Sequence, residues 1–228
     1  MKKRRKKSQF IVFEGIDGAG KTTQTKLLMK HLKKTGRKVV FIHFPQYQTK
    51  SGGLIENYLQ GQYGKVGPYQ ASVFYAADRF DGGLRIKQWL KDGYIVVADR
   101  YLASNIGHQG GKIRDIKERE KFFRWLYYFE YGIFQIPKPR LSFLLKMPPR
   151  IAQQLIKKHG KKLDIHERDI LHLQHADQAY RHATKVFPRD FQIIDSMNGK
   201  TLRSPKDIHN EVWNKVQKLL LAISPPLG

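Results

Sequence analysis

The sequence predicts a single doubly wound α/β domain, with a parallel five-stranded sheet and helices on both of its faces. Short runs of Val, Ile and Phe alternate with longer stretches of helical periodicity along the chain. The short runs are apolar at successive positions, which is typical of parallel strands buried on both faces. A chain of 228 residues is long enough for one such core, and no long linker divides it.

The expected strands are rich in β-branched and aromatic residues. They are Phe10–Glu14, Lys38–Phe44, Tyr94–Ala98, Leu141–Met147 and Phe191–Ile194. The expected helices carry apolar residues at three- and four-residue spacing. They are Lys21–Thr35, Leu54–Leu59, Pro68–Lys91, Lys117–Phe134, Pro149–His159, Ile170–Val186 and Pro205–Ala222. In a sheet of this kind, ligands bind beyond the carboxyl ends of the strands.

The N-terminal segment is strongly basic. Six of the first seven residues are Lys or Arg, so we expect residues 1–8 to be a disordered tail and residues 9–224 to form the domain. No apolar stretch after the tail is long enough for a signal peptide, and none reaches the ~20 residues of a membrane span. The absence of cysteine fits a reducing, cytoplasmic location.

The net charge of +24 raises the question of a nucleic-acid partner. Removing the six cations of the tail still leaves +18, spread along the chain rather than gathered in one stripe. We therefore expect a generally cationic surface and anionic phosphate ligands rather than a nucleic-acid partner.

The strongest local motif is Gly15-Ile-Asp-Gly-Ala-Gly-Lys-Thr22, which matches the P-loop pattern G-x-x-x-x-G-K-[ST]. It follows an expected strand and opens an expected helix, as a P-loop NTPase domain requires. The backbone N–H groups would cradle the phosphates of ATP, Lys21 would reach the β/γ oxygens, and the Thr22 hydroxyl would ligate Mg²⁺. The expected phosphate-binding residues are Gly15, Asp17, Gly18, Ala19, Gly20, Lys21, Thr22 and Thr23.

A second element ends the strand Tyr94–Ala98 with Asp99 and Arg100. A carboxylate at a strand end is aimed at the metal or its waters in P-loop enzymes, although Asp99 could instead cap the next helix. Arg100 would face the phosphates. A switch GTPase is disfavoured, because the pair Asn214-Lys215 is not followed by the x-Asp of a guanine-reading segment.

Four motifs in order resemble the thymidylate (dTMP) kinase family, and the resemblance covers essentially the whole chain. They are Phe13-Glu-Gly-Ile-Asp-Gly-Ala-Gly-Lys-Thr-Thr-Gln24, Phe44-Pro-Gln-Tyr47, Phe74-Tyr-Ala-Ala-Asp-Arg79 and Asp99-Arg-Tyr-Leu-Ala-Ser-Asn105. The resemblance implies phosphoryl transfer from ATP to dTMP, giving dTDP and ADP in dTTP biosynthesis. It also implies a homodimer.

The resemblance assigns the recognition of the pyrimidine to three residues. Tyr75 would stack on the ring, Arg79 would donate to its O4 carbonyl, and Asn105 would contact its N3 edge. Tyr75 and Arg79 are four residues apart, so one helix presents both on one face. Without the resemblance, Tyr75 would be an ordinary core aromatic and Arg79 a surface charge.

The resemblance also implies contacts to the sugar and phosphate of dTMP. Asp17 would accept a hydrogen bond from the 3′-hydroxyl, while Tyr47 and Arg100 would hold the phosphate, with Phe44 packing nearby. His108 stands where many relatives have Tyr, near the 2′ position of the sugar. Discrimination against ribonucleotides is therefore left open.

Stabilisation of the transferred phosphoryl group requires more positive charge than Lys21 and Mg²⁺ supply. In the family that the chain resembles, an extra arginine comes from either the P-loop or a mobile lid. The P-loop here contains no arginine, so the resemblance implies that a lid at about residues 157–168, rich in lysine, supplies it. Arg168 at its end is the candidate. The expected catalytic residues are therefore Lys21, Asp99, Arg100 and Arg168, with Thr22 and Asp99 at the metal.

Two other functions stay open. A deoxynucleoside kinase shares the P-loop but phosphorylates an uncharged hydroxyl, so it needs a general base, for which Glu14 and Asp99 are available. A cationic nucleic-acid-binding protein that uses ATP as a switch would show a steep salt dependence of binding.

Overall fold

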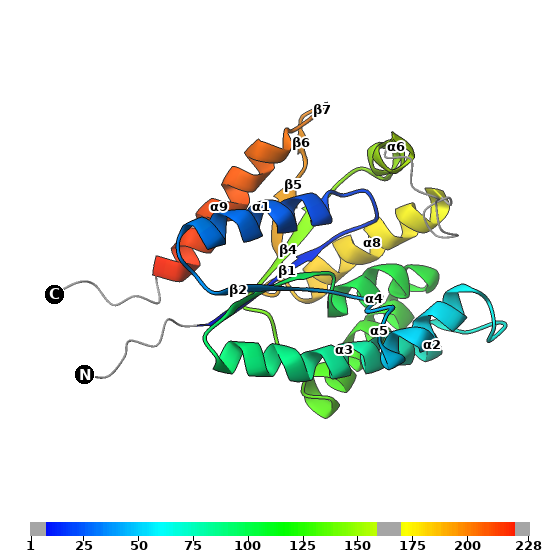
Figure 1. Ribbon diagram of the computed structural model, residues 1–228. Helices are drawn as coiled ribbons and strands as arrows, with labels where there is room; N and C mark the ends of the chain where they lie inside the picture. Colours follow the sequence, from blue (N-terminus) through cyan, green and yellow to red (C-terminus); the bar gives the residue numbers. More distant parts are fainter. Residues whose placement is uncertain (1–7, 159–169, 222–228) are drawn as a thin grey trace.

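The computed structural model describes residues 8–158 and 170–221, and it has the expected five-stranded parallel sheet with helices on both faces (Figure 1). The strands lie in the order β2-β3-β1-β4-β5, and each neighbouring pair is parallel. Their bounds are β1 Gln9–Glu14, β2 Val39–His43, β3 Ile95–Asp99, β4 Leu141–Lys146 and β5 Gln192–Asp195. Connections leave the central strand β1 toward both edges, so the ligand crevice lies beyond its carboxyl end.

The helices form two layers around this sheet. Helices α1 and α9 pack together on one face, and α3, α4 and α8 cover the other (Figure 1). The bounds are α1 Lys21–Lys34, α2 Lys50–Leu59, α3 Pro68–Lys91, α4 Leu102–His108, α5 Ile116–Tyr127, α6 Pro149–Lys158, α8 Ile170–Val186 and α9 Pro205–Leu221. A short 3₁₀ helix spans Gly110–Lys112, and a π-helix spans Tyr128–Ile133.

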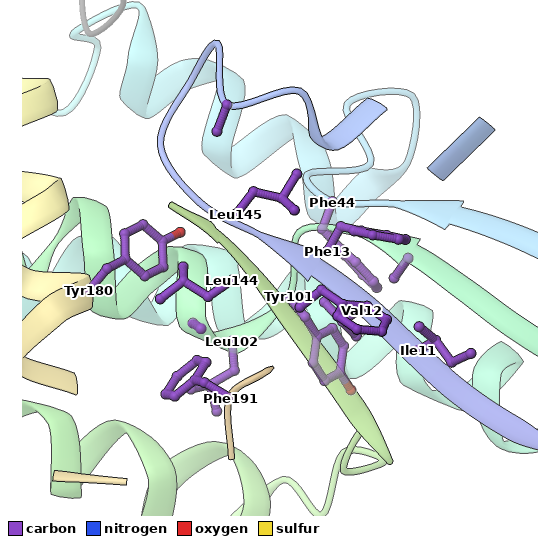
Figure 2. Packing of buried hydrophobic residues seen from close by; sticks show 14 of the residues in the cluster. Ile11, Val12, Phe13, Phe44, Tyr101, Leu102, Leu144, Leu145, Tyr180 and Phe191 are labelled. Atoms are coloured by element: carbon purple, nitrogen blue, oxygen red, sulfur yellow. The ribbon is translucent and has the colours of Figure 1, made fainter. Parts of the chain in front are cut away.

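The core is densest around β1. All six residues of this strand are buried, because it lies in the middle of a sheet that is covered on both faces. Figure 2 shows Ile11, Val12 and Phe13 of β1 among Leu144 and Leu145 of the neighbouring β4. This buried strand leads directly into the glycine-rich loop and so gives the loop a rigid base.

Several elements differ from the sequence-based expectation. Helix α2 begins at Lys50 rather than Leu54, because the Thr49 side chain accepts a hydrogen bond from the Gly52 amide and caps it. The helix expected over 117–134 is an α-helix followed by the π-helix. Helix α4 and a small antiparallel hairpin, β6 Met197–Asn198 with β7 Thr201–Leu202, were not predicted.

Within residues 8–158 and 170–221, no helix combines the length and the apolar character that a membrane crossing would require.

Candidate active site

The glycine-rich loop between β1 and α1 adopts a conformation that only glycine accepts easily. Gly15, Gly18 and Gly20 have φ values of 137°, 78° and 89°. A Cβ at Gly15 would lie 2.7 Å from the Leu145 carbonyl oxygen, so a larger residue would also collide with β4. The loop can therefore turn sharply and present its backbone N–H groups at the start of α1, where the helix dipole favours phosphate.

Lys21 is buried beneath this loop. Its ammonium group donates to the carbonyl oxygens of Gly15, at 3.0 Å, and Ile16, at 2.9 Å. Burial, and then the charge of Arg100, lower the pKa of Lys21 to about 8. Burial therefore makes the charged form of Lys21 less favourable than it would be in water. Phosphate oxygens could replace the two carbonyl oxygens as acceptors of its hydrogen bonds.

Thr22 and Asp99 meet beside the loop. The Thr22 hydroxyl donates to Oδ2 of Asp99 at 2.7 Å. The other oxygen of Asp99, Oδ1, is buried and finds no hydrogen-bond partner among the described residues. A hydroxyl and a carboxylate oxygen without a partner are hard oxygen donors, so the two side chains fit Mg²⁺ or its waters.

Arg100 follows β3 in a left-handed conformation, with a φ of 70°. One amino group of its guanidinium donates to Asp17, and the other lies 3.2 Å from the Ser104 hydroxyl and 3.0 Å from Nε2 of His108. Burial raises the pKa of Asp17, but the charges of Arg100 and Lys21 outweigh it, so the pKa lies well below its usual range. Asp17 is therefore a carboxylate at neutral pH.

His108 is a neutral member of the same cluster. Burial, and then the charge of Arg100, hold the pKa of His108 well below its ordinary value. Because a guanidinium only donates, Nε2 of His108 accepts from Arg100, and Nδ1 then donates to Nε2 of His172 at 3.1 Å.

A cavity of about 310 Å³ opens between α3, α4 and the strand ends. The structure brings together around it all eight residues that the sequence predicted for the phosphate acceptor. They are Asp17, Phe44, Tyr47, Tyr75, Arg79, Arg100, Asn105 and His108.

A second cavity, of about 380 Å³, lies over the glycine-rich loop. Residues 17–23 form one wall, and apolar side chains form the other. The apolar residues are Met147, Leu155, Ile156, Leu202, Pro205 and Ile208. Among the residues that line either cavity, Asp17 and Arg100 are the two common to both.

The structure excludes the reading of Arg79 as a surface charge. Its side chain is 2% exposed, and it forms a bidentate ion pair with Glu130 of the π-helix, with both N–O distances at 2.6 Å. Glu130 was not singled out in the sequence. One signal could have found it, because it is the lone charge in the aromatic run 127–131.

Arg203 is a second residue that sequence reasoning missed. It lines the cavity over the loop and donates to the Asp195 carbonyl oxygen at 2.7 Å and to Glu211 at 2.8 Å. It follows the unpredicted hairpin β6–β7, so no sequence signal placed it there.

Arg168 lies outside the described residues. Helix α6 ends with Lys157 and Lys158, both exposed. The catalytic role of Arg168 and the lid at residues 157–168 therefore stay predictions.

A parallel sheet with a P-loop, a buried loop lysine, a Thr–Asp pair suited to Mg²⁺ and a second polar cavity beside it defines a P-loop kinase that acts on a small acceptor. The size of the acceptor cavity and its mixture of aromatic and charged walls suit a nucleoside monophosphate.

Comparison with known proteins identifies the family. The family model Thymidylate kinase matches residues 13–211. A thymidylate kinase from Plasmodium falciparum is 30% identical over 215 residues, covering 94% of this chain and 92% of its own. One from Caldicellulosiruptor saccharolyticus is 38% identical over 166 residues, covering 72% of this chain and 77% of its own. The chain belongs to the thymidylate kinase family.

The fold agrees with this assignment. The solved structure of thymidylate kinase from Candida albicans superposes with a TM-score of 0.74 at 23% identity, covering 93% of this chain and 92% of that one. As a member of the family, the protein is a transferase that phosphorylates dTMP with ATP as the donor, in the synthesis of dTTP.

Proposed function

We propose that the cavity between α3 and α4 holds dTMP, that the cavity over the P-loop holds ATP with Mg²⁺, and that the phosphoryl group passes between them. The observation that supports this most strongly is that Asp17 and Arg100 line both cavities. The Asp17 carboxylate can accept a hydrogen bond from the sugar hydroxyl of dTMP. The Arg100 guanidinium can bind the phosphates of the two nucleotides.

On the acceptor side, each residue has a chemically defined task. Tyr75 stacks on the thymine ring, and Arg79 and Asn105 hydrogen-bond its polar edge. Asp17 accepts a hydrogen bond from the 3′-hydroxyl of dTMP. Arg100 and Tyr47 hold the dTMP phosphate, so that one of its oxygens lies in line with the γ-phosphorus of ATP. The acceptor phosphate is already ionised at neutral pH, so the reaction needs positioning and positive charge rather than a strong base.

On the donor side, the backbone N–H groups of the P-loop and the Lys21 ammonium bind the triphosphate. Thr22 and Asp99 would hold Mg²⁺, which would neutralise negative charge on the triphosphate. The apolar wall that includes Leu155 and Ile208 packs against the adenine base.

The competing deoxynucleoside kinase reaction requires a free general base beside the acceptor hydroxyl. Glu14 is instead engaged, since it accepts from the Tyr101 amide at 2.8 Å and from the Ser104 hydroxyl at 2.7 Å. Asp99, the other candidate base, accepts from the Thr22 hydroxyl and does not line the cavity between α3 and α4. The positions of both carboxylates favour the monophosphate as acceptor.

We further propose that the enzyme is a cytoplasmic homodimer whose domain spans residues 9–224, with a dispensable tail before it. Helix α3 supports the dimer, because Tyr69, Val73, Phe80 and Leu84 follow one helical stripe and are 38–53% exposed. Leu84→Glu on this stripe should lower the molar mass measured by sedimentation to that of one chain. An unchanged mass would reject α3 as the interface.

The test of the function is ADP release with ATP and Mg²⁺ against a panel of acceptors. We expect dTMP to be used far better than thymidine, dCMP or purine monophosphates. Preference for thymidine would establish the nucleoside kinase reaction instead, and equal use of dCMP would reject the proposed recognition of the base.

A further inference from the structure

Glu130 lies behind the two residues that are proposed to read the thymine base. It is fully buried in the π-helix Tyr128–Ile133 and does not line the acceptor cavity. Its two carboxylate oxygens accept from Nε and Nη2 of Arg79. The side chain of Asn105 is also near enough to oppose the rise that burial causes in the pKa of Glu130. One buried carboxylate thus holds Arg79 and faces Asn105.

These bonds determine how the Asn105 amide is turned. Its NH₂ group donates to the Ser72 carbonyl oxygen at 3.2 Å. A carboxylate can only accept, so the NH₂ group is also the end of the amide that suits the side facing Glu130. The NH₂ group is therefore engaged on the protein side. The atom that Asn105 offers to the cavity is its oxygen, an acceptor.

The same reasoning applies to Arg79. The pair with Glu130 uses Nε and Nη2, so the Nη1 group is the donor that Arg79 can turn toward the cavity. An acceptor from Asn105 beside a donor from Arg79 complements thymine, which presents its N3–H as donor and O4 as acceptor. Cytosine presents the opposite pattern at these positions, with N3 as acceptor and its amino group as donor.

We propose that Glu130 is a specificity-determining positioning residue, which imposes on Arg79 and Asn105 the donor–acceptor order that selects thymine over cytosine. This inference rests on the proposed function, because it requires dTMP to occupy the cavity between α3 and α4. Burial of an ion pair at this place stabilises the fold little compared with apolar packing, so a role in orientation explains why the charges are there.

The test measures kcat/KM for dTMP and for dCMP in Glu130→Gln and Glu130→Asp. The first substitution keeps the shape of the side chain but places an NH₂ group against Arg79 or Asn105. The second keeps the charge but shortens the side chain, so that it cannot reach both partners. We expect the preference for dTMP to fall by about tenfold or more in each variant, through a higher KM for dTMP, while KM for ATP stays as in the wild type.

Leu126→Ala is the matched control, because Leu126 is fully buried on the neighbouring helix α5 and its loss lowers stability without changing the cavity. Its preference for dTMP should equal that of the wild type. If Glu130→Gln is too unstable to purify, Glu130→Asp decides the question.

The outcomes distinguish a failure of the role of Glu130 from a failure of the proposed function, the phosphorylation of dTMP in this cavity. If the wild type does not prefer dTMP to dCMP, the proposed function itself is wrong. If the wild type does prefer dTMP and Arg79→Ala loses that preference, but both Glu130 variants retain it, then only the role of Glu130 is rejected.

Discussion

The two cavities of this kinase are built by different means. The cavity proposed for the phosphate donor takes its polar wall from one continuous segment, residues 17–23, which joins the glycine-rich loop to the first turn of α1. The cavity proposed for the acceptor takes its polar wall from side chains on separate elements that are already paired: Asp17 with Arg100 in the wall itself, and Arg79 with Glu130 behind the wall. A triphosphate needs only N–H groups and charge, whereas choosing one base requires side chains held in a fixed orientation.

From this difference we expect turnover to depend on positive charge in the cavity for ATP. We expect recognition of the base to depend on the orientation of side chains in the cavity for dTMP. Lys21→Ala removes the buried loop cation and should lower kcat on the order of 10³-fold. The melting temperature should change little, because the buried ammonium group is costly to hold and Asp17, 4.0 Å from it, keeps Arg100 as its partner. Steady-state kinetics of the purified variant check this, and near-normal turnover would remove the P-loop lysine from the mechanism.

Arg79→Ala should affect folding as well as recognition, unlike the change at Lys21. It leaves Glu130 buried without its cation, so the free energy of unfolding should fall by about 3–5 kcal/mol, measured by urea denaturation. The double variant Arg79→Met/Glu130→Leu should recover most of that stability but not the use of dTMP. Recovery of both would show that the ion pair has no part in binding the base.

The low pKa of Lys21, about 8, makes the donor side sensitive to alkaline pH. The protonated lysine is the form that we propose to bind phosphate. Raising the pH from 8 to 9 leaves most of the free enzyme without that charge. The affinity for ATP should therefore fall roughly fivefold over this unit. Titration of ATP binding at each pH checks this, and Lys21→Arg, which stays charged, should show no such fall.

The smallest effect is expected at the N-terminal tail. A protein that begins at Ser8 should keep its kcat and both KM values at physiological salt, because we expect the binding of both nucleotides to rest on the domain that follows the tail. A large loss of kcat would show that the tail contributes to catalysis.

The difference between the cavities also explains what could be predicted from the sequence. The strand–loop–helix arrangement around Lys21 is local, so one continuous motif located the donor side. The alternation of apolar strands and periodic helices was sufficient to predict the parallel five-stranded sheet. The prediction of the fold class is confirmed.

The supporting residues could not be predicted in the same way. Glu130 and Arg79 are 51 positions apart in the sequence, and their pairing depends on a π-helix that interrupts an otherwise regular helical pattern. Arg203 reaches the donor cavity only because of a two-residue-strand hairpin whose sequence carries no strong strand signal. Tertiary contacts of this kind have no local signature.

The central claim is that the two cavities are one active site joined at Asp17 and Arg100. The most direct measurement uses a single ligand in which thymidine and adenosine are linked 5′ to 5′ by a polyphosphate. We predict that it competes with both dTMP and ATP in steady-state inhibition, and that Arg100→Ala weakens its binding more than it weakens that of ATP. Competition with only one substrate would contradict the account.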